Sequence, residues 1–351
     1  MSDHNLSRWD DETDYSHYIE KFETQEERKA RRGRKPKVKH VPKKSEAEVL
    51  AELVDDTAGL EGGFKTTYTP QRFEQGWLLE ALRTFYEQSL ITDVLGSVKG
   101  GKEASVYRCA AHPAVGVALL AAKVYRPRMF RNLRNDALYR EGREVLTETG
   151  KGLRARDHRT IRALGKKTDY GQQVAHTSWL MHEFNTLKAL HEAGAAVPMP
   201  YAAGQNAILM GYVGAERVAA PTLHEVRLER KEVQPLFEEV MRNIELLLNL
   251  GYAHGDLSAY NILYWEGEIT LIDFPQVALV RGNRSAFQIL ARDIRRVCDY
   301  FATYGLKRDP MLLADNMWRR NTELKPGSLP YDPLEDEEDR ASDDAEDDGE
   351  E

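Results

Sequence analysis

Three polar residues constrain the fold of this chain most, because their spacing places them around one short hairpin. Asp256 lies directly after a predicted helix, and Asn261 follows it by five residues. Asp273 ends the strand that comes next, 17 residues after Asp256. Each alone could cap a turn or end a strand, but together they offer a proton acceptor and two hard oxygen ligands for Mg²⁺. The set predicts phosphoryl transfer, with Asp256 accepting the proton and Asn261 and Asp273 binding the metal.

The pattern of apolar residues predicts an α+β fold in which two lobes enclose a cleft. Short strand-like runs dominate up to residue 213, and helices around a hairpin follow. Ser285 is the expected cap of the last strong helix. The expected elements are helices from 73, from about 179 to 194, at 236–250 and from 285, a buried strand at 207–213, and a hairpin at 262–272.

Lys123 lies inside an otherwise apolar strand at 119–125. A lysine in such a strand must reach an edge or find an anionic partner. We interpret it as a ligand of nucleotide phosphates that also pairs with a carboxylate on a helix. Glu183 is the candidate, because we expect it early in the helix after the Arg-rich stretch; the alternative is an ordinary exposed acid.

A glycine turn at 100–107 lies between two predicted strands, shortly before Lys123. Glycines let backbone N–H groups approach phosphates closely, although a hairpin turn explains them equally well. The run is neither a Walker A loop nor the kinase pattern of three spaced glycines. Its position makes it a candidate nucleotide-binding turn, and the residues assigned to it are Gly100, Gly101, Lys102 and Val106.

The net charge of −8 conceals a strong asymmetry. Residues 28–44 are dense in Arg and Lys, whereas 335–351 are nearly all Asp and Glu. Blocks of like charge usually remain solvated tails. Within the basic run, 31–37 resembles an AT-hook, with Lys35 as a departure from that pattern. The run therefore predicts either contact with nucleic acid, DNA or rRNA, or a solvated basic linker.

Bulk properties favour a folded core with polar extensions, since 41% of the 351 residues are hydrophobic and 30% charged. Cys109 and Cys298 show neither a disulfide framework nor metal-ligand spacing, so we expect a cytoplasmic protein. We expect no signal peptide and no membrane span. The predicted plan is a disordered arm at 1–45, a helical lead-in at 46–95, an N-terminal lobe at 96–213 with a flexible Arg-rich insertion at 126–167, a helical C-terminal lobe at 214–325 and a disordered acidic tail at 326–351.

Four segments of the chain carry a specific resemblance to a known family. They read Gly-Lys-Glu-Ala-Ser-Val-Tyr at 101–107, Lys at 123, His-Gly-Asp-Leu-Ser-Ala-Tyr-Asn at 254–261, and Ile-Asp-Phe-Pro-Gln at 272–276. Together they resemble the RIO family of atypical serine/threonine protein kinases and ATPases, and its first subfamily more than the second, whose winged helix is not recognisable. The resemblance covers roughly 73–306. It implies a two-lobed protein-kinase-like fold that uses ATP with Mg²⁺, or Mn²⁺ as an alternative.

The resemblance also implies roles for the residues around the hairpin. Asp256 is implied as the catalytic proton acceptor, and Asn261 and Asp273 as metal ligands. Asp273 is further implied as a catalytic residue that accepts a phosphoryl group and becomes an aspartyl-phosphate. This intermediate makes the family as much ATPase as kinase. Ser258 stands where ordinary protein kinases have a lysine. The short run at 274–285 leaves no room for an activation loop and implies a reduced C-terminal lobe.

Further residues match the family or depart from it. The backbone of Met210, Tyr212 and Val213 is implied as the hinge that holds adenine. Asp293 is implied to bond to the backbone of the catalytic loop, with a surface acid as the alternative. Lys99 stands in a position where the family has a hydroxyl residue, so its charge would replace a phosphate contact.

Two other functions remain open. The first is a small-molecule phosphotransferase of the aminoglycoside or choline kinase type, which shares the His-Gly-Asp motif. The second is a nucleic-acid-binding adaptor whose kinase core acts as a nucleotide-gated switch. The substrate of a kinase would be another protein or this chain itself, and the long insertion at 126–167 contains several threonines. The resemblance also suggests a role near ribosome maturation.

Overall fold

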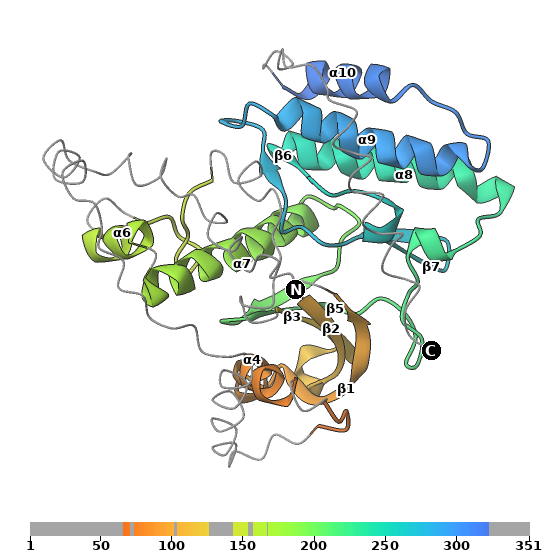
Figure 1. Cartoon of the computed structure of the whole chain (residues 1–351). Coiled ribbons are helices and arrows are strands. Elements are labelled where there is room, and N and C mark those ends of the chain that lie inside the picture. Colours follow the sequence, from red (N-terminus) through yellow and green to blue (C-terminus); the bar gives the residue numbers. More distant parts are fainter. Residues whose placement is uncertain are drawn as a thin grey trace, which may run out of the picture.

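The structure, a computed structural model, describes residues 66–70, 74–101, 104–125, 143–153, 157–166 and 168–322 (Figure 1). The basic run at 28–44, the acidic tail at 326–351 and Lys102 lie outside the described residues. Within the described part of the chain, no helix is both long and apolar enough to cross a bilayer.

The N-terminal lobe contains one antiparallel sheet of five strands in the order β1-β2-β3-β5-β4. The central strand β3 is paired at both edges, and its side chains are buried on both faces of the sheet, which explains its almost entirely apolar sequence. The strands are β1 (Ile91–Gly100), β2 (Ala104–Ala111), β3 (Leu119–Tyr125), β4 (Pro200–Ala203) and β5 (Ala207–Gly211), with a short 3₁₀ helix η2 (Pro113–Val115) before β3.

The two faces of β3 contact different parts of the protein. Successive side chains of a strand point to opposite faces. Leu120 and Val124 therefore share one apolar cluster with Leu82 of helix α4 (Gln75–Glu87). Figure 1 shows α4 against the sheet on the side away from the C-terminal lobe. Lys123 belongs to the opposite face, which turns toward the C-terminal lobe.

The C-terminal lobe is mainly helical (Figure 1), and its helices surround two short antiparallel ribbons, β6–β9 and β7–β8. The predicted hairpin is confirmed: Ile262 pairs with Leu271, and the turn residues Glu266 and Gly267 have φ of 51° and 88°. Positive φ at both positions is typical of a type I′ turn. The elements are η4 (Leu223–Glu225), α8 (Arg230–Asn249), β6 (Tyr252–Ala253), η5 (Ala259–Asn261), β7 (Ile262–Trp265), β8 (Glu268–Leu271), β9 (Ala278–Leu279), α9 (Ala286–Ala302) and α10 (Pro310–Asn321).

Helix α7 (Asp169–Glu192) connects the lobes, and it differs from the prediction. It begins at Asp169 rather than near Trp179, because Thr168 accepts a hydrogen bond from Gly171 N at 3.1 Å and the first turns are polar. Glu183 consequently lies well inside the helix instead of early in it. The apolar side chains of α7 join the core of the C-terminal lobe, while α7 also contacts β4 and β5. The preceding helix α6 (His158–Gly165) was not predicted.

Two further helix starts differ from expectation. Helix α8 begins at Arg230, before its apolar stripe, because the side chains of Glu229 and Glu232 form a capping box. Ser285 does precede α9, but its side chain makes no capping hydrogen bond. Instead, Asn283 Oδ1 accepts from Ser285 N at 2.8 Å. The predicted α+β class is confirmed.

Candidate active site

A cavity of about 550 Å³ is lined by residues of both lobes. Apolar walls with a few converging polar groups are typical of a small-molecule site. Its apolar walls include Val106 and Ala121 from the sheet and Leu263 and Ile272 from the hairpin region. The polar or charged side chains that line it are Lys99, Lys123, Glu183, Tyr212, Thr222, Glu225, Asn261 and Asp273.

Lys123 lies at the centre of the charged part of the cavity. Its Nζ is 2.7 Å from Glu183 Oε1 and also donates to Asp273 Oδ1. Burial by itself lowers the pKa of Lys123, but Asp273 and Glu183 outweigh it and hold this pKa well above its usual value. The ammonium therefore stays charged, and it joins the sheet, helix α7 and the end of the hairpin.

Tyr125, two residues further along β3, supports this ion pair although the sequence did not reveal it. Its hydroxyl donates to Glu183 Oε2, and its ring meets the ring of Trp179 edge-on with centroids 4.7 Å apart. Burial and the charge of Glu183 raise the pKa of Tyr125, so the hydroxyl keeps its proton. The signal was available in principle, because residues two apart on a strand share a face.

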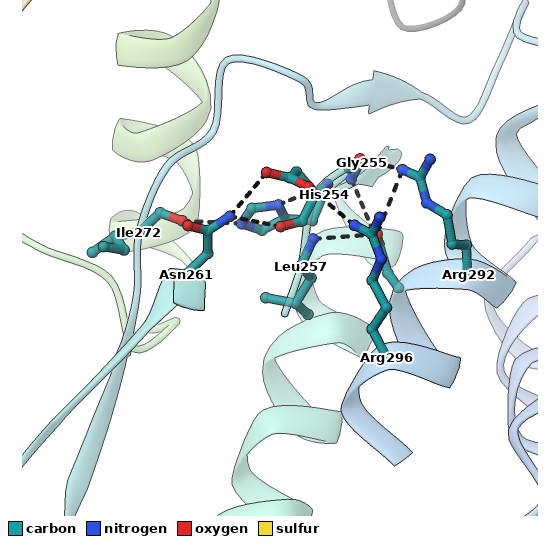
Figure 2. A network of polar contacts seen from close by, with 9 residues as sticks. His254, Gly255, Leu257, Asn261, Ile272, Arg292 and Arg296 are labelled. Atoms are coloured by element: carbon teal, nitrogen blue, oxygen red, sulfur yellow. Dashed lines mark hydrogen bonds and ion pairs between the residues drawn. The ribbon is translucent and has the colours of Figure 1, made fainter. Parts of the chain in front are cut away.

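The loop that carries Asp256 is held by helix α9, as Figure 2 shows. Asp293 accepts from Gly255 N at 2.8 Å and from Leu257 N at 3.2 Å, which confirms the predicted bond to the loop backbone. Arg292 Nη2 donates to Gly255 O. Because the N–H groups of Gly255 and Leu257 both donate to the carboxylate of Asp293, the backbone is fixed on both sides of Asp256.

The carboxylate of Asp256 has a partner on each oxygen. Arg296 Nη1 is 3.0 Å from Oδ1, and Asn261 Nδ2 donates to Oδ2 at 3.1 Å. Asn261 Nδ2 also donates to Asp256 O at 2.7 Å, so the amide nitrogen of Asn261 faces Asp256. Burial raises the pKa of Asp256, and Arg296 opposes that rise. Arg296 was not predicted; it shares a helix face with Asp293 and Arg292.

His254 ties this loop to the strand that precedes Asp273 (Figure 2). Its Nε2 lies 3.2 Å from Ile272 O, and Asp256 N lies 3.4 Å from its Nδ1. A neutral ring satisfies both contacts when Nε2 carries the proton. Burial lowers the pKa of His254, in agreement with a neutral ring. Ile272 N in turn donates to Asn261 O at 3.0 Å, which brings Asn261 beside Asp273.

Asp273 has an unusual backbone conformation, with φ of 71°. For a residue other than glycine this left-handed conformation is uncommon and concentrates at functional sites. Burial alone would raise the pKa of Asp273, but Lys123 outweighs burial and lowers it, so the carboxylate is ionised. The segment after Asp273 is held by Arg143, whose Nη2 donates to Pro275 O at 3.1 Å and to Val277 O.

The structure brings most of the predicted site residues to one cavity. Gly100 and Asp256 are not among the lining residues: Gly100 pairs with Ser105 in the sheet, and Asp256 adjoins the cavity through Asn261. At Gly101 a Cβ would lie 2.8 Å from Ala104 O, so the turn itself requires glycine there. The predicted residues that do line the cavity are Gly101, Val106, Lys123, Glu183, Met210, Tyr212, Val213, Asn261 and Asp273.

The donor atoms near Asp273 fit the Mg²⁺ that the sequence implies. Because the amide nitrogen of Asn261 faces Asp256, its amide oxygen is directed elsewhere and can serve as a ligand, together with the Asp273 carboxylate. Carboxylate and amide oxygens suit a hard ion that keeps several waters or phosphate oxygens. In the described residues, no group of three or more His, Cys, Asp or Glu side chains is arranged to hold a metal ion.

Comparison with known proteins identifies the family. A family model described as "RIO domain" matches residues 138–312. The chain is 32% identical over 216 residues to the RIO-type serine/threonine-protein kinase Rio1 of Haloferax volcanii, covering 61% of this chain and 65% of that protein. It is 30% identical over 231 residues to the serine/threonine-protein kinase RIO1 of Chaetomium thermophilum, covering 62% and 41%. The match to the RIO-type serine/threonine-protein kinase Rio2 of Methanocaldococcus jannaschii is 32% identical over 182 residues, covering 49% and 64%.

The chain therefore spans less than two thirds of each of these three relatives. The region that matches the family model contains Glu183, Asp256, Asn261 and Asp273, while Lys123 lies before it. The resemblance first read from the motifs is confirmed, as is the expected fold of two lobes around a cavity. The chain belongs to the RIO family, whose RIO domain has a protein-kinase-like fold.

Proposed function

We propose that this chain is a Mg-ATP-dependent phosphotransferase that acts as a serine/threonine protein kinase, as an ATPase, or as both. The observation that carries the proposal is the position of Lys123, which meets Glu183 and Asp273 in a cavity that also exposes Asn261. A fixed cation beside two oxygen ligands is the arrangement that positions and neutralises a triphosphate. The names of the relatives support the same class of reaction.

In the proposed reaction, the side chains divide the work. Lys123 contacts phosphate oxygens, and Glu183 holds its ammonium in place. Asn261 and Asp273 would hold Mg²⁺, which would offset charge on the phosphates. An acceptor hydroxyl attacks the γ-phosphorus, the bond to the β–γ bridging oxygen breaks and ADP leaves. Asp256 accepts the hydroxyl proton. When no hydroxyl is present, a carboxylate oxygen of Asp273 attacks instead, and water then releases phosphate from the acyl-phosphate.

The test is incubation of the full chain with γ-labelled ATP and Mg²⁺. Acid-stable protein label indicates Ser or Thr phosphorylation, and label removed by hydroxylamine indicates a phosphate on Asp273. Asp256→Ala should remove labelling of hydroxyl acceptors, and Asp273→Ala should remove both labels and phosphate release. Asp299→Ala, an exposed acid on α9, is the matched control. Undiminished labelling and phosphate release in both site variants would refute the proposal.

The same experiment distinguishes the runner-up, a kinase for small alcohols or amines. Such an enzyme would turn over a small acceptor rapidly and leave the protein unlabelled.

The buried, unpaired Cys109 and Cys298 agree with the cytoplasmic location that we propose.

A further inference from the structure

The cation that faces the candidate catalytic carboxylate comes from helix α9 and not from the catalytic loop. Arg296 Nη1 lies 3.0 Å from Asp256 Oδ1, and the two residues are 40 positions apart in the chain. Figure 2 shows Arg296 reaching from α9 toward the loop, with Arg292 one turn before it. Both arginines draw the pKa of Asp256 down against the effect of burial.

The catalytic loop contains no cation of its own. From His254 to Asn261 it reads His-Gly-Asp-Leu-Ser-Ala-Tyr-Asn, without Lys or Arg. Ser258 stands where ordinary protein kinases have a lysine two residues after the aspartate. The described structure thus shows an aspartate whose usual neighbouring charge is missing from the loop, and a guanidinium from another element in contact with the same carboxylate.

We propose that Arg296 is a positioning residue for Asp256. It holds Asp256 in the rotamer that receives the acceptor proton. Asn261 holds Oδ2 and Arg296 holds Oδ1, so the carboxylate is fixed at both oxygens. A carboxylate has about four acceptor positions, so these two hydrogen bonds still leave room for the acceptor hydroxyl.

A purely structural role for Arg296 is the competing explanation, and the structure offers an argument against it. Helix α9 is already fastened to the loop by Asp293, which accepts from Gly255 N and Leu257 N, and by Arg292 at Gly255 O. These contacts involve the backbone on both sides of Asp256. Arg296 instead contacts the Asp256 carboxylate itself. Its removal should therefore release Oδ1 of Asp256, while Asn261 still holds Oδ2 and the loop stays in place.

The inference rests on the proposed function, and second-site recovery tests it. The full chain is compared with Arg296→Gln, Arg296→Lys and the double variant Arg296→Gln/Ser258→Lys. Arg319→Gln, which breaks an exposed Arg–Asp pair on α10, is the control. The measurements are kcat and the KM for ATP of γ-phosphate transfer or release, together with the thermal unfolding midpoint.

We expect Arg296→Gln to lower kcat about 100-fold, as misplacement of a reacting group does, with the KM for ATP unchanged. Arg296→Lys should retain more activity than Arg296→Gln. Ser258→Lys should recover about 10-fold in the Arg296→Gln background, because it restores a cation within the loop. A wild-type or raised kcat in Arg296→Gln, or a loss that neither lysine recovers, would overturn the inference while the proposed function stands. An inactive wild-type chain would rule out both this inference and the proposed function.

Discussion

The Nζ atom of Lys123 lies 2.7 Å from Glu183 Oε1 and also contacts Asp273, so one buried ammonium joins three elements. Both lysine and glutamate are almost fully buried, with 11% and 5% of their side-chain surface exposed. Buried ions persist only when they are paired and hydrogen-bonded. The contacts of Lys123 with Glu183 and Asp273 therefore hold β3, α7 and the end of the hairpin together around the cavity.

Removing the charge of Glu183 should impair catalysis. In Glu183→Gln, Lys123 keeps Asp273 as a partner but loses the group that directs it toward the phosphates. We expect ATP-dependent phosphate release to fall about 10- to 100-fold, which is the size of effect seen when a preorganised charge is lost. Glu192→Gln, which breaks the exposed pair with Lys188 on the same helix, is the control. Equal rates in the two variants would contradict this assignment.

The hydroxyl of Tyr125 should stabilise the fold through Glu183. Tyr125→Phe keeps the ring that packs on Trp179 and removes only the donor to the buried carboxylate. A hydrogen bond to a charged group contributes about 1.5–3 kcal/mol, so the free energy of unfolding should fall by about that amount. Urea unfolding measures it. Tyr170→Phe removes an exposed hydroxyl contact and should change stability little; a similar loss in both would argue against the buried bond.

Replacing Asp293 by asparagine should lower the free energy of unfolding. Its two oxygens accept from two N–H groups, whereas an asparagine presents one oxygen and one NH₂ group. One backbone donor would then face another donor, at a cost of about 1–3 kcal/mol. Chemical denaturation of Asp293→Asn should show this loss, and the exposed Asp299→Asn on the same helix should not. Unchanged stability in Asp293→Asn would mean that the loop is held by other contacts.

The half-buried His182 should make the fold less stable as the pH falls. Burial and the charge of Arg143 lower the pKa of His182 to about 4, whereas an unfolded histidine has a pKa of about 6.5. Between these values the unfolded chain binds a proton that the folded chain excludes, so stability decreases as the pH falls from 6.5 toward 4.

His182→Gln should therefore reduce this pH dependence, by at most about 1.4 kcal/mol per pH unit. Urea unfolding at pH 7, 6 and 5 measures the slope for wild type and variant. His191→Gln, at the exposed end of the same helix, should leave the slope as in wild type. An identical slope in all three proteins would show that His182 does not titrate in this range.

Local regularities in the sequence were enough to predict much of the candidate site. The five-residue step from Asp256 to Asn261 and the following hairpin identified the loop, because hairpin and helix periods are local properties. Lys123 was detectable because a charge inside an apolar strand demands a partner. The predicted start of α7 near Trp179 was wrong, because the polar first turns of this helix carry no apolar stripe. Only the cap at Thr168 marks where the helix begins.

By itself, the sequence determined the family and the fold class, and it predicted the carboxylates and the lysine of the proposed phosphoryl-transfer site, because these depend on residue types at fixed short spacings. Only the tertiary structure decided which groups complete that site. Arg296 and Arg143 reach the residues around it from segments distant in the chain. The physical reason is that a buried or ionised group is satisfied by whatever packing brings into contact, and packing across distant segments leaves no local periodic signal.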